Sequence, residues 1–386
     1  EGPAVQLDLS LTPVSSGEFW TARQRAGNSL HEISYRACFK PPLAHYFIER
    51  FSASGDVVYD PFMGRGTAPL EAALKGRIPW GRDSNPLSEI LLTPRLAPPR
   101  LEEVENRLKE IEFGCPNAMK TEDLLVFFHP ETLEEILALR YYLNERERRG
   151  RLDAIDAWIR MVAINRLTGH SPGFFSVYSM PPNQAVSVKS QRRINKRMDQ
   201  EPPRRDVPGL IVRKTRALLK DATDDIRSTL SEVFERAQIT TGNARSAPEL
   251  SSDSAALVLT SPPFLDVVNY STDNWLRCWF AGIDLDEVHF DEHRRVEDWC
   301  AFMVEPIKDA ARILKIGGTL ALEIGEVRAG TIRLEEHIAP LDNGAGLRPI
   351  EILINDQSFT KTAHTWGVTN NTRGTNTNRV VVFRKE

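Results

Sequence analysis

The stretch GDVVYDPFMGRGTAPLEAALKGR, residues 55–77, decides the fold. Its apolar residues from Val57 to Tyr59 predict a short buried strand, and Gly64-Arg65-Gly66 follows as a turn. A helix is predicted from Thr67 to Lys75, with Gly76 at its C-terminal end. The next segment, IPWGRD at 78–83, is typical of a second strand. A strand, a glycine turn, a helix and a strand in this order indicate a parallel α/β sheet.

Further short strands follow a long helical region. The candidates, from about residue 238 onward, are AQITTGNA, AALVLTSPPF, GGTLALEIGE, RPIEILIND and NRVVVFRKE. Strands that alternate with helices imply a mainly parallel, doubly wound sheet. The last two strands are expected to form a terminal antiparallel hairpin. We therefore predict a Rossmann-like α/β fold, interrupted by a mostly helical insertion.

The expected division of the chain follows from this pattern. Residues 1–29 are expected to be irregular, and residues 30–100 together with 237–386 to form the α/β domain. The proline-rich stretch TPRLAPPR at 93–100 predicts a boundary before the helical insertion 101–236. Within the insertion, the apolar spacing of 208–236 predicts one long amphipathic helix.

Two features at strand ends indicate a bound nucleotide-like cofactor. Gly64 and Gly66 allow close approach of a ligand to a helix N-terminus. Asp83 ends the next strand, where a carboxylate can accept hydrogen bonds from both ribose hydroxyl groups. Each feature has an alternative when it is taken alone. The alternative for the glycine turn is an ordinary strand–helix connection, and the alternative for Asp83 is a helix cap. Together the two features favour an adenosine-containing cofactor, and the missing G-x-G-x-x-G pattern argues against a dinucleotide.

The predicted strand that ends with LVLT at 257–260 is followed directly by Ser261-Pro262-Pro263-Phe264. Two prolines fix φ and supply no N–H donors, so this turn offers only carbonyl acceptors. The alternative is a proline-capped strand end with an aromatic ring in the core.

With both motifs in view, the chain resembles the S-adenosylmethionine-dependent DNA amino-methyltransferases, which methylate N4 of cytosine or N6 of adenine. Phe62, Gly64 and Gly66 match the family's F-x-G-x-G cofactor turn, and Ser261 to Phe264 match its [D/N/S]-P-P-[Y/F/W] catalytic tetrapeptide. The resemblance covers roughly residues 30–100 and 237–386. It implies a methyltransferase fold, S-adenosylmethionine as cofactor, double-stranded DNA as substrate, and a cognate restriction endonuclease as a partner.

The resemblance also implies a set of cofactor-binding residues. HEISYRACFKPPL at 31–43 resembles the N-terminal cofactor segment, and GNA at 242–244 resembles the position that contacts adenine. The residues carried over in this way, together with the turn and Asp83, are Tyr35, Lys40, Asp60, Pro61, Phe62, Gly64, Gly66, Thr67, Asp83, Asn85, Asn243 and Ala244.

The chemistry of an exocyclic amine explains the tetrapeptide. Its lone pair is delocalised into the ring, so acceptors such as the Pro262 carbonyl and the Ser261 hydroxyl would free it for in-line attack. The base must leave the duplex to be reached, and Phe264 supplies a face for stacking. Ser at the first position favours cytosine N4, with its hydroxyl expected to accept from the amine and donate to the ring nitrogen. Methylation of adenine N6, an RNA substrate and a non-catalytic nucleic-acid-binding role remain alternatives. None of the four cysteines follows a proline, which argues against C5 methylation.

The charge distribution directs attention to one strip. The net charge is −4, so nucleic-acid binding requires a local basic patch. Residues 187–221 contain eleven Lys and Arg against four Asp and Glu. The expected phosphate contacts are Lys189, Arg192, Arg193, Lys196 and Arg197, and a solvated helix face is the alternative. The Thr- and Asn-rich stretch 360–379 suits hydrogen bonding to nucleotides, or is a hairpin loop.

The remaining expectations concern location and metals. No run of about 18 apolar residues and no signal peptide are visible, so a membrane span is not expected. The four cysteines are scattered without a C-x-x-C pair. This spacing predicts no metal site and favours a reducing cytoplasm.

Overall fold

The computed structural model describes residues 12–20, 27–35, 38–114, 122–180, 185–263, 270–291, 293–324, 333–338, 344–355 and 378–386. In this part of the chain an eight-stranded sheet has the order β1-β7-β8-β6-β5-β2-β3-β4. The strands are β1 Val14–Gly17, β2 Val57–Asp60, β3 Ile78–Asp83, β4 Gln238–Thr241, β5 Ala255–Thr260, β6 Leu314–Ile324, β7 Leu347–Asn355 and β8 Asn378–Lys385.

The sheet is mainly parallel, as the sequence predicts. Within the described residues, neighbouring strands pair in parallel except at β8, which lies antiparallel to both β6 and β7. The β7–β8 pair is the expected terminal hairpin. The predicted Rossmann-like fold is therefore confirmed.

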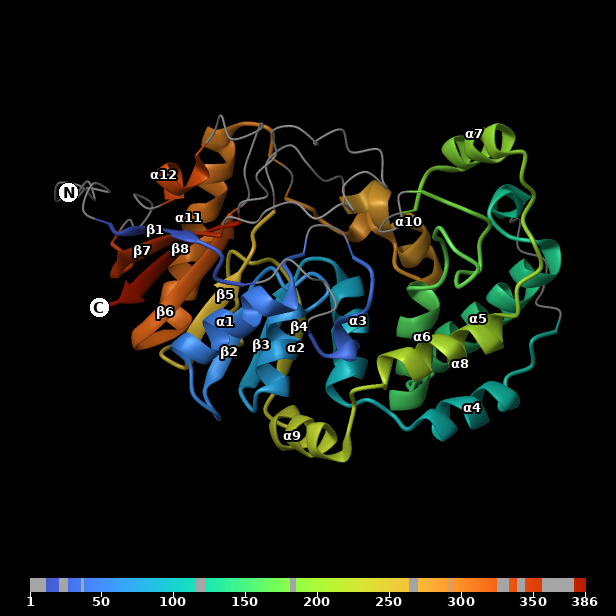
Figure 1. The fold of residues 1–386 in the computed structure, drawn as a ribbon, viewed down its shortest axis with the longest axis horizontal. Helices are drawn as coiled ribbons and strands as arrows, with labels where there is room; N and C mark the ends of the chain where they lie inside the picture. Colours follow the sequence, from blue (N-terminus) through green and yellow to red (C-terminus); the bar gives the residue numbers. More distant parts are fainter. Residues whose placement is uncertain are drawn as a thin grey trace.

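Helices cover both faces of the sheet and build a lobe beside it (Figure 1). They are α1 Pro41–Phe51, α2 Thr67–Leu74, α3 Pro86–Leu96, α4 Leu101–Glu110, α5 Pro130–Arg148, α6 Ala154–Ile164, α7 Val188–Met198, α8 Val207–Leu218, α9 Asp224–Phe234, α10 Tyr270–Ala281, α11 Val296–Ile313 and α12 Leu334–Ile338. Short 3₁₀ turns lie at Ser29–His31, Glu122–Val126 and Leu285–Glu287. Helices α4 to α8 form the lobe, next to α3 (Figure 1).

Alternation along the strands divides the core of the sheet into two layers. Val58 and Leu257 point to the layer that contains α1, whereas Tyr59 and Val258 point to the layer that contains Trp299 of α11. Successive side chains of a strand face opposite sides, so a doubly wound sheet buries both sets.

The lobe shares its core with the α/β part. One hydrophobic cluster contains Leu91 of α3, Ile136 of α5, Trp158 of α6 and Leu276 of α10. Side chains of the lobe also hold the end of α10, since Arg140 Nε donates to the Trp279 carbonyl at 2.8 Å and Arg160 Nη2 to the Ala281 carbonyl at 2.6 Å. These bonds satisfy carbonyls that a helix end leaves without partners.

Three expectations differ from the structure. The single helix predicted over 208–236 is two helices, α8 and α9, because Thr223 caps α9 by accepting from the Ile226 N–H at 3.3 Å. The first 29 residues are not wholly irregular, since β1 adds an edge strand to β7. The boundary expected at 93–100 begins later, because α3 continues through Pro94 to Leu96.

None of the helices in the described ranges is long and apolar enough to cross a membrane.

Candidate functional site

A left-handed glycine turn joins β2 to α2. Gly64 and Gly66 have φ angles of 50° and 76°, and Gly66 is the N-cap of α2. A Cβ on Gly66 would stand 2.7 Å from a side-chain carbon of Leu92. The backbone angle and the close approach of Leu92 therefore both require glycine at position 66.

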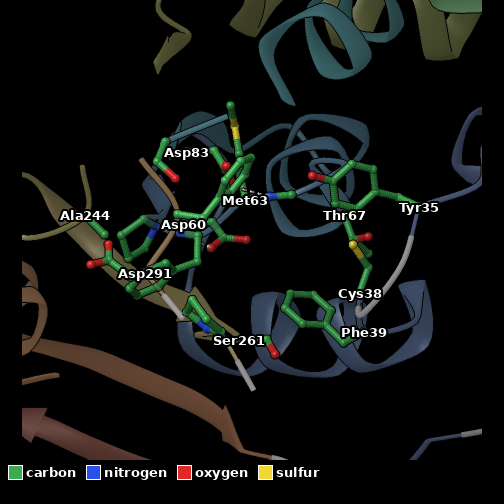
Figure 2. Close-up of a pocket in the computed structure, with 16 residues that line it drawn as sticks. Tyr35, Cys38, Phe39, Asp60, Met63, Thr67, Asp83, Ala244, Ser261 and Asp291 are labelled. Atoms are coloured by element: carbon green, nitrogen blue, oxygen red, sulfur yellow. Dashed lines mark hydrogen bonds between the residues drawn. The ribbon is translucent and has the colours of Figure 1, made fainter. Parts of the chain in front are cut away.

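One cavity gathers most of the residues expected at the site (Figure 2). Its empty volume is about 740 Å³, part of it open to solvent. Tyr35, Cys38 and Phe39 lie on one side and Ala244 and Asp291 on the other (Figure 2). The full lining is Tyr35, Cys38, Phe39, Asp60, Pro61, Phe62, Met63, Gly64, Thr67, Asp83, Ser84, Ala244, Ser261, Pro263, Phe290 and Asp291. The cofactor turn and the start of the proline tetrapeptide thus face the same space.

Four expected cofactor residues do not line this cavity. Lys40 is the N-cap of α1 and Gly66 that of α2. Asn85 caps α3 by accepting from the Leu87 N–H at 3.0 Å, and its Nδ2 donates to the Tyr35 hydroxyl at 3.4 Å. Asn243 lies outside, where its Oδ1 accepts from the Arg245 N–H at 2.8 Å. Asn85 thus contacts Tyr35, which lines the cavity.

Asp83 ties the glycine turn to α3. Its Oδ2 accepts from the Gly64 N–H at 2.8 Å and its Oδ1 from the Asn85 N–H at 2.9 Å. Burial raises the pKa of Asp83, although these hydrogen bonds oppose the effect. Each carboxylate oxygen has further acceptor capacity, so Asp83 can still take hydroxyl donors from a ligand in the cavity.

Asp60 is the second carboxyl group at this edge of the sheet, and it is 1% exposed. Its Oδ1 accepts from the Thr260 hydroxyl at 2.5 Å and from the Phe62 N–H at 3.0 Å. Burial, with a smaller contribution from the nearby charge of Asp83, raises the pKa of Asp60 to about 7. A cation in the cavity would favour the ionised form of Asp60.

Ser261, at the end of β5, donates its hydroxyl proton to Oε2 of Glu323 at 2.7 Å. Glu323 lies on β6, the neighbouring strand, and is 3% exposed. A serine hydroxyl has one proton and two acceptor lone pairs. In this structure the hydroxyl proton is directed to Glu323, and the hydroxyl oxygen is available as an acceptor.

The two prolines differ in how their carbonyls are used. The Pro263 carbonyl accepts from Trp299 Nε1 at 2.9 Å, which fixes the turn to α11. Pro262 is buried and does not line the cavity. Phe264, the expected stacking residue, lies outside the described residues, as does all of 360–379 except its last two positions.

Several residues at the site escaped the sequence analysis. Glu323 does not line the cavity but holds Ser261, and it could have been suspected as a lone carboxylate in the apolar strand TLALEI. Phe290 and Asp291 come from the irregular segment before α11, and no motif marks them. Asp291 is held by Arg245 Nη2 at 2.7 Å.

Helix α7 carries the expected phosphate-binding residues. Arg192 pairs with Asp123 at 2.7 Å. Lys189, Arg193, Lys196 and Arg197 are exposed and form no ion pair with a residue that the structure describes. Just before α7, the Ala185 N–H donates to the Asp273 carbonyl at 3.0 Å, and Trp275 Nε1 donates to the Val186 carbonyl at 3.3 Å. The chain leading into α7 is thus attached to α10, the next described element after the tetrapeptide.

No family model matches this chain. In sequence, the chain is similar to two Type II methyltransferases. M.BsoBI of Geobacillus stearothermophilus is 25% identical over 282 residues, which are 66% of this chain and 53% of the relative. M.MvaI of Kocuria varians is 32% identical over 83 residues, or 21% of this chain and 18% of the relative. The chain thus spans about half of the length of M.BsoBI and less than a fifth of M.MvaI.

Solved structures give weaker similarities. TrmN from Thermus thermophilus has a TM-score of 0.34 and 13% identity, covering 91% of this chain and 50% of its own. The rRNA methyltransferase aviRa from Streptomyces viridochromogenes has a TM-score of 0.36 and 12% identity, covering 94% and 91%. A DNA modification methylase homologue, also from Thermus thermophilus, has a TM-score of 0.22 and 21% identity, covering 37% and 50%. Scores of this size do not bear on function.

Proposed function

We propose that this chain is a DNA methyltransferase that transfers the methyl group of S-adenosylmethionine to the exocyclic N4 amine of a flipped-out cytosine. The observation that carries the proposal is the single cavity lined by the glycine turn, Asp83, Ser261 and Pro263. Similarity to M.BsoBI and M.MvaI, both named Type II methyltransferases, favours methyl transfer and DNA as the substrate.

The cofactor-binding roles follow from the donors and acceptors around the cavity. Asp83 would accept hydrogen bonds from ribose hydroxyl groups, because it ends the strand next to the glycine turn. Gly64 and Thr67 would lie against the ligand at the start of α2, and Asp60 would balance a positive charge. When bound, S-adenosylmethionine would supply an electrophilic methyl group on a positively charged sulfur.

The tetrapeptide would hold the amine for attack. The Ser261 hydroxyl oxygen, which faces the cavity, would accept one N–H donor, and the carbonyl of Pro262, which is buried in this structure and follows Ser261, would accept the other. These two bonds would draw the nitrogen lone pair out of the ring. As the new N–C bond forms, the sulfur–methyl bond breaks and its electrons stay on sulfur. The amine must then lose one proton. The Ser261 oxygen can take that proton while its own proton passes to Glu323, which is 2.7 Å away.

The choice of cytosine rests on Ser261. A neutral hydroxyl avoids placing a charge beside the electron-rich N3 and O2 edge of cytosine. Adenine presents a similar amine, so N6 of adenine is the competing target, to be separated from N4 by experiment.

We further propose that residues 101–236 bind the DNA duplex. Helix α7 presents Arg193, Lys196 and Arg197 to solvent, and the chain entering α7 is bonded to α10. Phosphate contacts there would orient a duplex toward the cavity.

The test is transfer of labelled methyl groups from S-adenosylmethionine to matched duplex DNA and structured RNA. Label in DNA alone is expected, together with weaker DNA binding when Arg193, Lys196 and Arg197 are all changed to Gln. Arg192→Gln is the control, because Arg192 is already paired with Asp123. Label in RNA alone would reject DNA as the substrate, and equal DNA binding by the triple variant would reject α7 as a contact.

A further inference from the structure

Three arginine side chains meet near the segment that carries Tyr35. Arg166 follows α6, Arg213 lies on α8 and Arg277 lies on α10. Across the described ranges, none of the three has a carboxylate oxygen within ion-pair distance. This differs from the arginines of the lobe surface, such as Arg204 and Arg216, which pair with glutamates.

Arg277 is the most unusual of the three, because it is only 7% exposed. A guanidinium has five N–H donors, and the hydrogen bond found for Arg277 runs from Nη1 to Asn274 Oδ1 at 3.2 Å. Its guanidinium carbon also lies 6.0 Å from the centre of the Tyr35 ring. A buried cation without an ion-pair partner is costly. An anionic ligand at this position would reduce that cost.

Arg166 and Arg213 flank the same turn. A Cβ placed on Gly173 would be 3.3 Å from Arg213 Nη2 and 3.9 Å from Arg166 Nη1. Arg213 Nη2 donates to the Pro172 carbonyl at 3.2 Å, and the Arg166 guanidinium packs 4.1 Å from the centre of the Phe174 ring. Both side chains are thus held in place by the turn.

The charges of Arg213 and Arg277 both act on the ionisation of Arg166. Burial, together with the smaller effect of the charges of Arg213 and Arg277, lowers the pKa of Arg166 to about 10. Burial also lowers the pKa of Arg277, and the nearby charge of Asp273 opposes this only in part. A ligand with negative charge would relieve the mutual repulsion.

We propose that Arg166, Arg213 and Arg277 form a phosphate-binding site for a phosphodiester of bound DNA beside the nucleotide whose base enters the cavity. The inference rests on the proposed function. It deepens that function by naming a contact outside α7 that would hold the flipped strand.

The position of the cluster fits this role. Tyr35 lines the cavity and contacts Arg277, and Asn165, next to Arg166, accepts from the Ser34 N–H at 2.9 Å. The arginines therefore adjoin the wall of the cavity without lining it themselves. Guanidinium groups bind phosphate oxygens in a bidentate manner, and such contacts fix the position of a nucleic-acid strand. The carboxylate of the cofactor is the other source of an oxyanion, and the experiment separates the two.

The experiment compares Arg213→Gln with Arg216→Gln. Both residues are exposed on α8, but Arg216 pairs with Glu105 at 3.4 Å, which makes it a matched control. The binding constant K for a duplex that contains the sequence methylated by the wild type is measured at several salt concentrations. Affinity for S-adenosylmethionine is measured by calorimetry. Arg213→Gln is expected to reduce the slope of log K against log salt by about 0.9 while cofactor affinity is unchanged. Arg216→Gln is expected to alter neither.

Arg277→Gln provides a second reading, with thermal unfolding as the check on folding. It is expected to reduce the salt slope like Arg213→Gln, again with unchanged cofactor affinity. Equal salt slopes for wild type and Arg213→Gln, with methylation intact, overturn the phosphate site and leave the proposed function standing. Reduced cofactor affinity in these variants assigns the anion to the cofactor carboxylate and also overturns it. A wild-type protein that methylates no DNA removes both.

Discussion

Asp60 is the residue whose ionisation the fold disturbs most clearly within the cavity. Its pKa is raised to about 7 from 3.8, with burial as the main cause. Because the folded pKa is the higher one, the stability it contributes is full below about pH 4 and is lost as the pH rises through about 7.

The prediction is that Asp60→Asn removes this loss. Asparagine keeps an acceptor for the Thr260 hydroxyl and carries no charge. The variant should match wild type near pH 4 and exceed it in free energy of unfolding above about pH 7, by roughly 4 kcal/mol at most. Urea unfolding across this pH range is the measurement. A stability difference that does not change with pH would show that Asp60 ionises normally.

Glu323 is the residue on which the proposed proton path depends. Glu323→Gln keeps an acceptor for Ser261 but loses basicity. The rate of methyl transfer should fall roughly 100-fold, the lower end of general-base effects, with little change in affinity for S-adenosylmethionine. Glu351→Gln is the control, since Glu351 lies on β7 of the same sheet and pairs with Arg50 at 2.7 Å. An undiminished rate in a folded Glu323→Gln protein would remove Glu323 from the mechanism.

These two residues also show what the sequence could and could not reveal. Asp60 could be predicted because it ends a strand directly before a glycine turn, which is a local pattern. The partner of Ser261 could not, because Glu323 reaches it only through the pairing of β5 with β6, 62 residues away in the chain. Of the GNA segment, Ala244 lines the cavity, whereas the Asn243 side chain accepts from the Arg245 N–H, and Asp291 lines the cavity without any motif that marks it.

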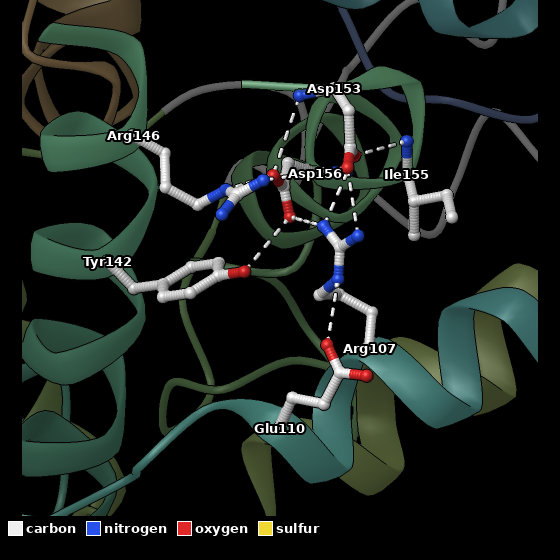
Figure 3. A network of polar contacts seen from close by, with 7 residues as sticks. All are labelled: Arg107, Glu110, Tyr142, Arg146, Asp153, Ile155 and Asp156. Atoms are coloured by element: carbon white, nitrogen blue, oxygen red, sulfur yellow. Dashed lines mark hydrogen bonds and ion pairs between the residues drawn. The ribbon is translucent and has the colours of Figure 1, made fainter. Parts of the chain in front are cut away.

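At the scale of elements, a buried carboxylate joins three helices of the lobe (Figure 3). Asp156 of α6 is fully buried and receives Arg107 of α4, Arg146 of α5 and the Tyr142 hydroxyl at 3.4 Å. Asp153, the N-cap of α6, accepts from the same Arg107 at 2.8 Å. The network therefore links α4, α5 and α6 through one buried carboxylate.

We expect Asp156→Ala to lower the free energy of unfolding by about 3 kcal/mol, because a buried ion pair loses one partner. Glu110→Gln is the matched control, since Glu110 pairs with Arg107 at 3.3 Å but its side chain is 70% exposed. It should cost less than about 1 kcal/mol. Chemical unfolding of the two variants provides the comparison, and equal effects would mean that burial does not set the strength of this network.

The helices themselves were predictable where caps and apolar spacing agree. A proline at the start and an apolar face predict α1 and α5. The break between α8 and α9 depends on the cap residue Thr223, which apolar periodicity alone does not reveal. The attachment of the segment before α7 to α10 depends on contacts made by Ala185 and Trp275, which no local pattern encodes.

At the scale of the whole molecule, the α/β part and the helical lobe are joined by a common core and by α10. Arg140 and Arg160 of the lobe hold the last turn of α10 by hydrogen bonds. The segment before α7 is hydrogen-bonded near the first turn of α10. Helix α10 is thus in contact with the proposed DNA-binding region and is the first described element after the tetrapeptide.

The strands β2 to β8 and the two motifs could be predicted from the sequence, because they are local patterns. The extent of the shared core could not be predicted, since it requires residues from α3, α5, α6 and α10 to meet in space. For the same reason, the arginines at positions 166, 213 and 277 belong to three different helical regions, and their meeting is visible only in the folded chain.

The most direct measurement digests duplex DNA that the protein has methylated with isotopically labelled S-adenosylmethionine and separates the nucleosides by mass spectrometry. We predict label in N4-methyl-2′-deoxycytidine, and far less labelled nucleoside with the Ser261→Ala variant than with the wild type. Label in N6-methyl-2′-deoxyadenosine would contradict the base assignment, and DNA without any labelled nucleoside would contradict the proposed function.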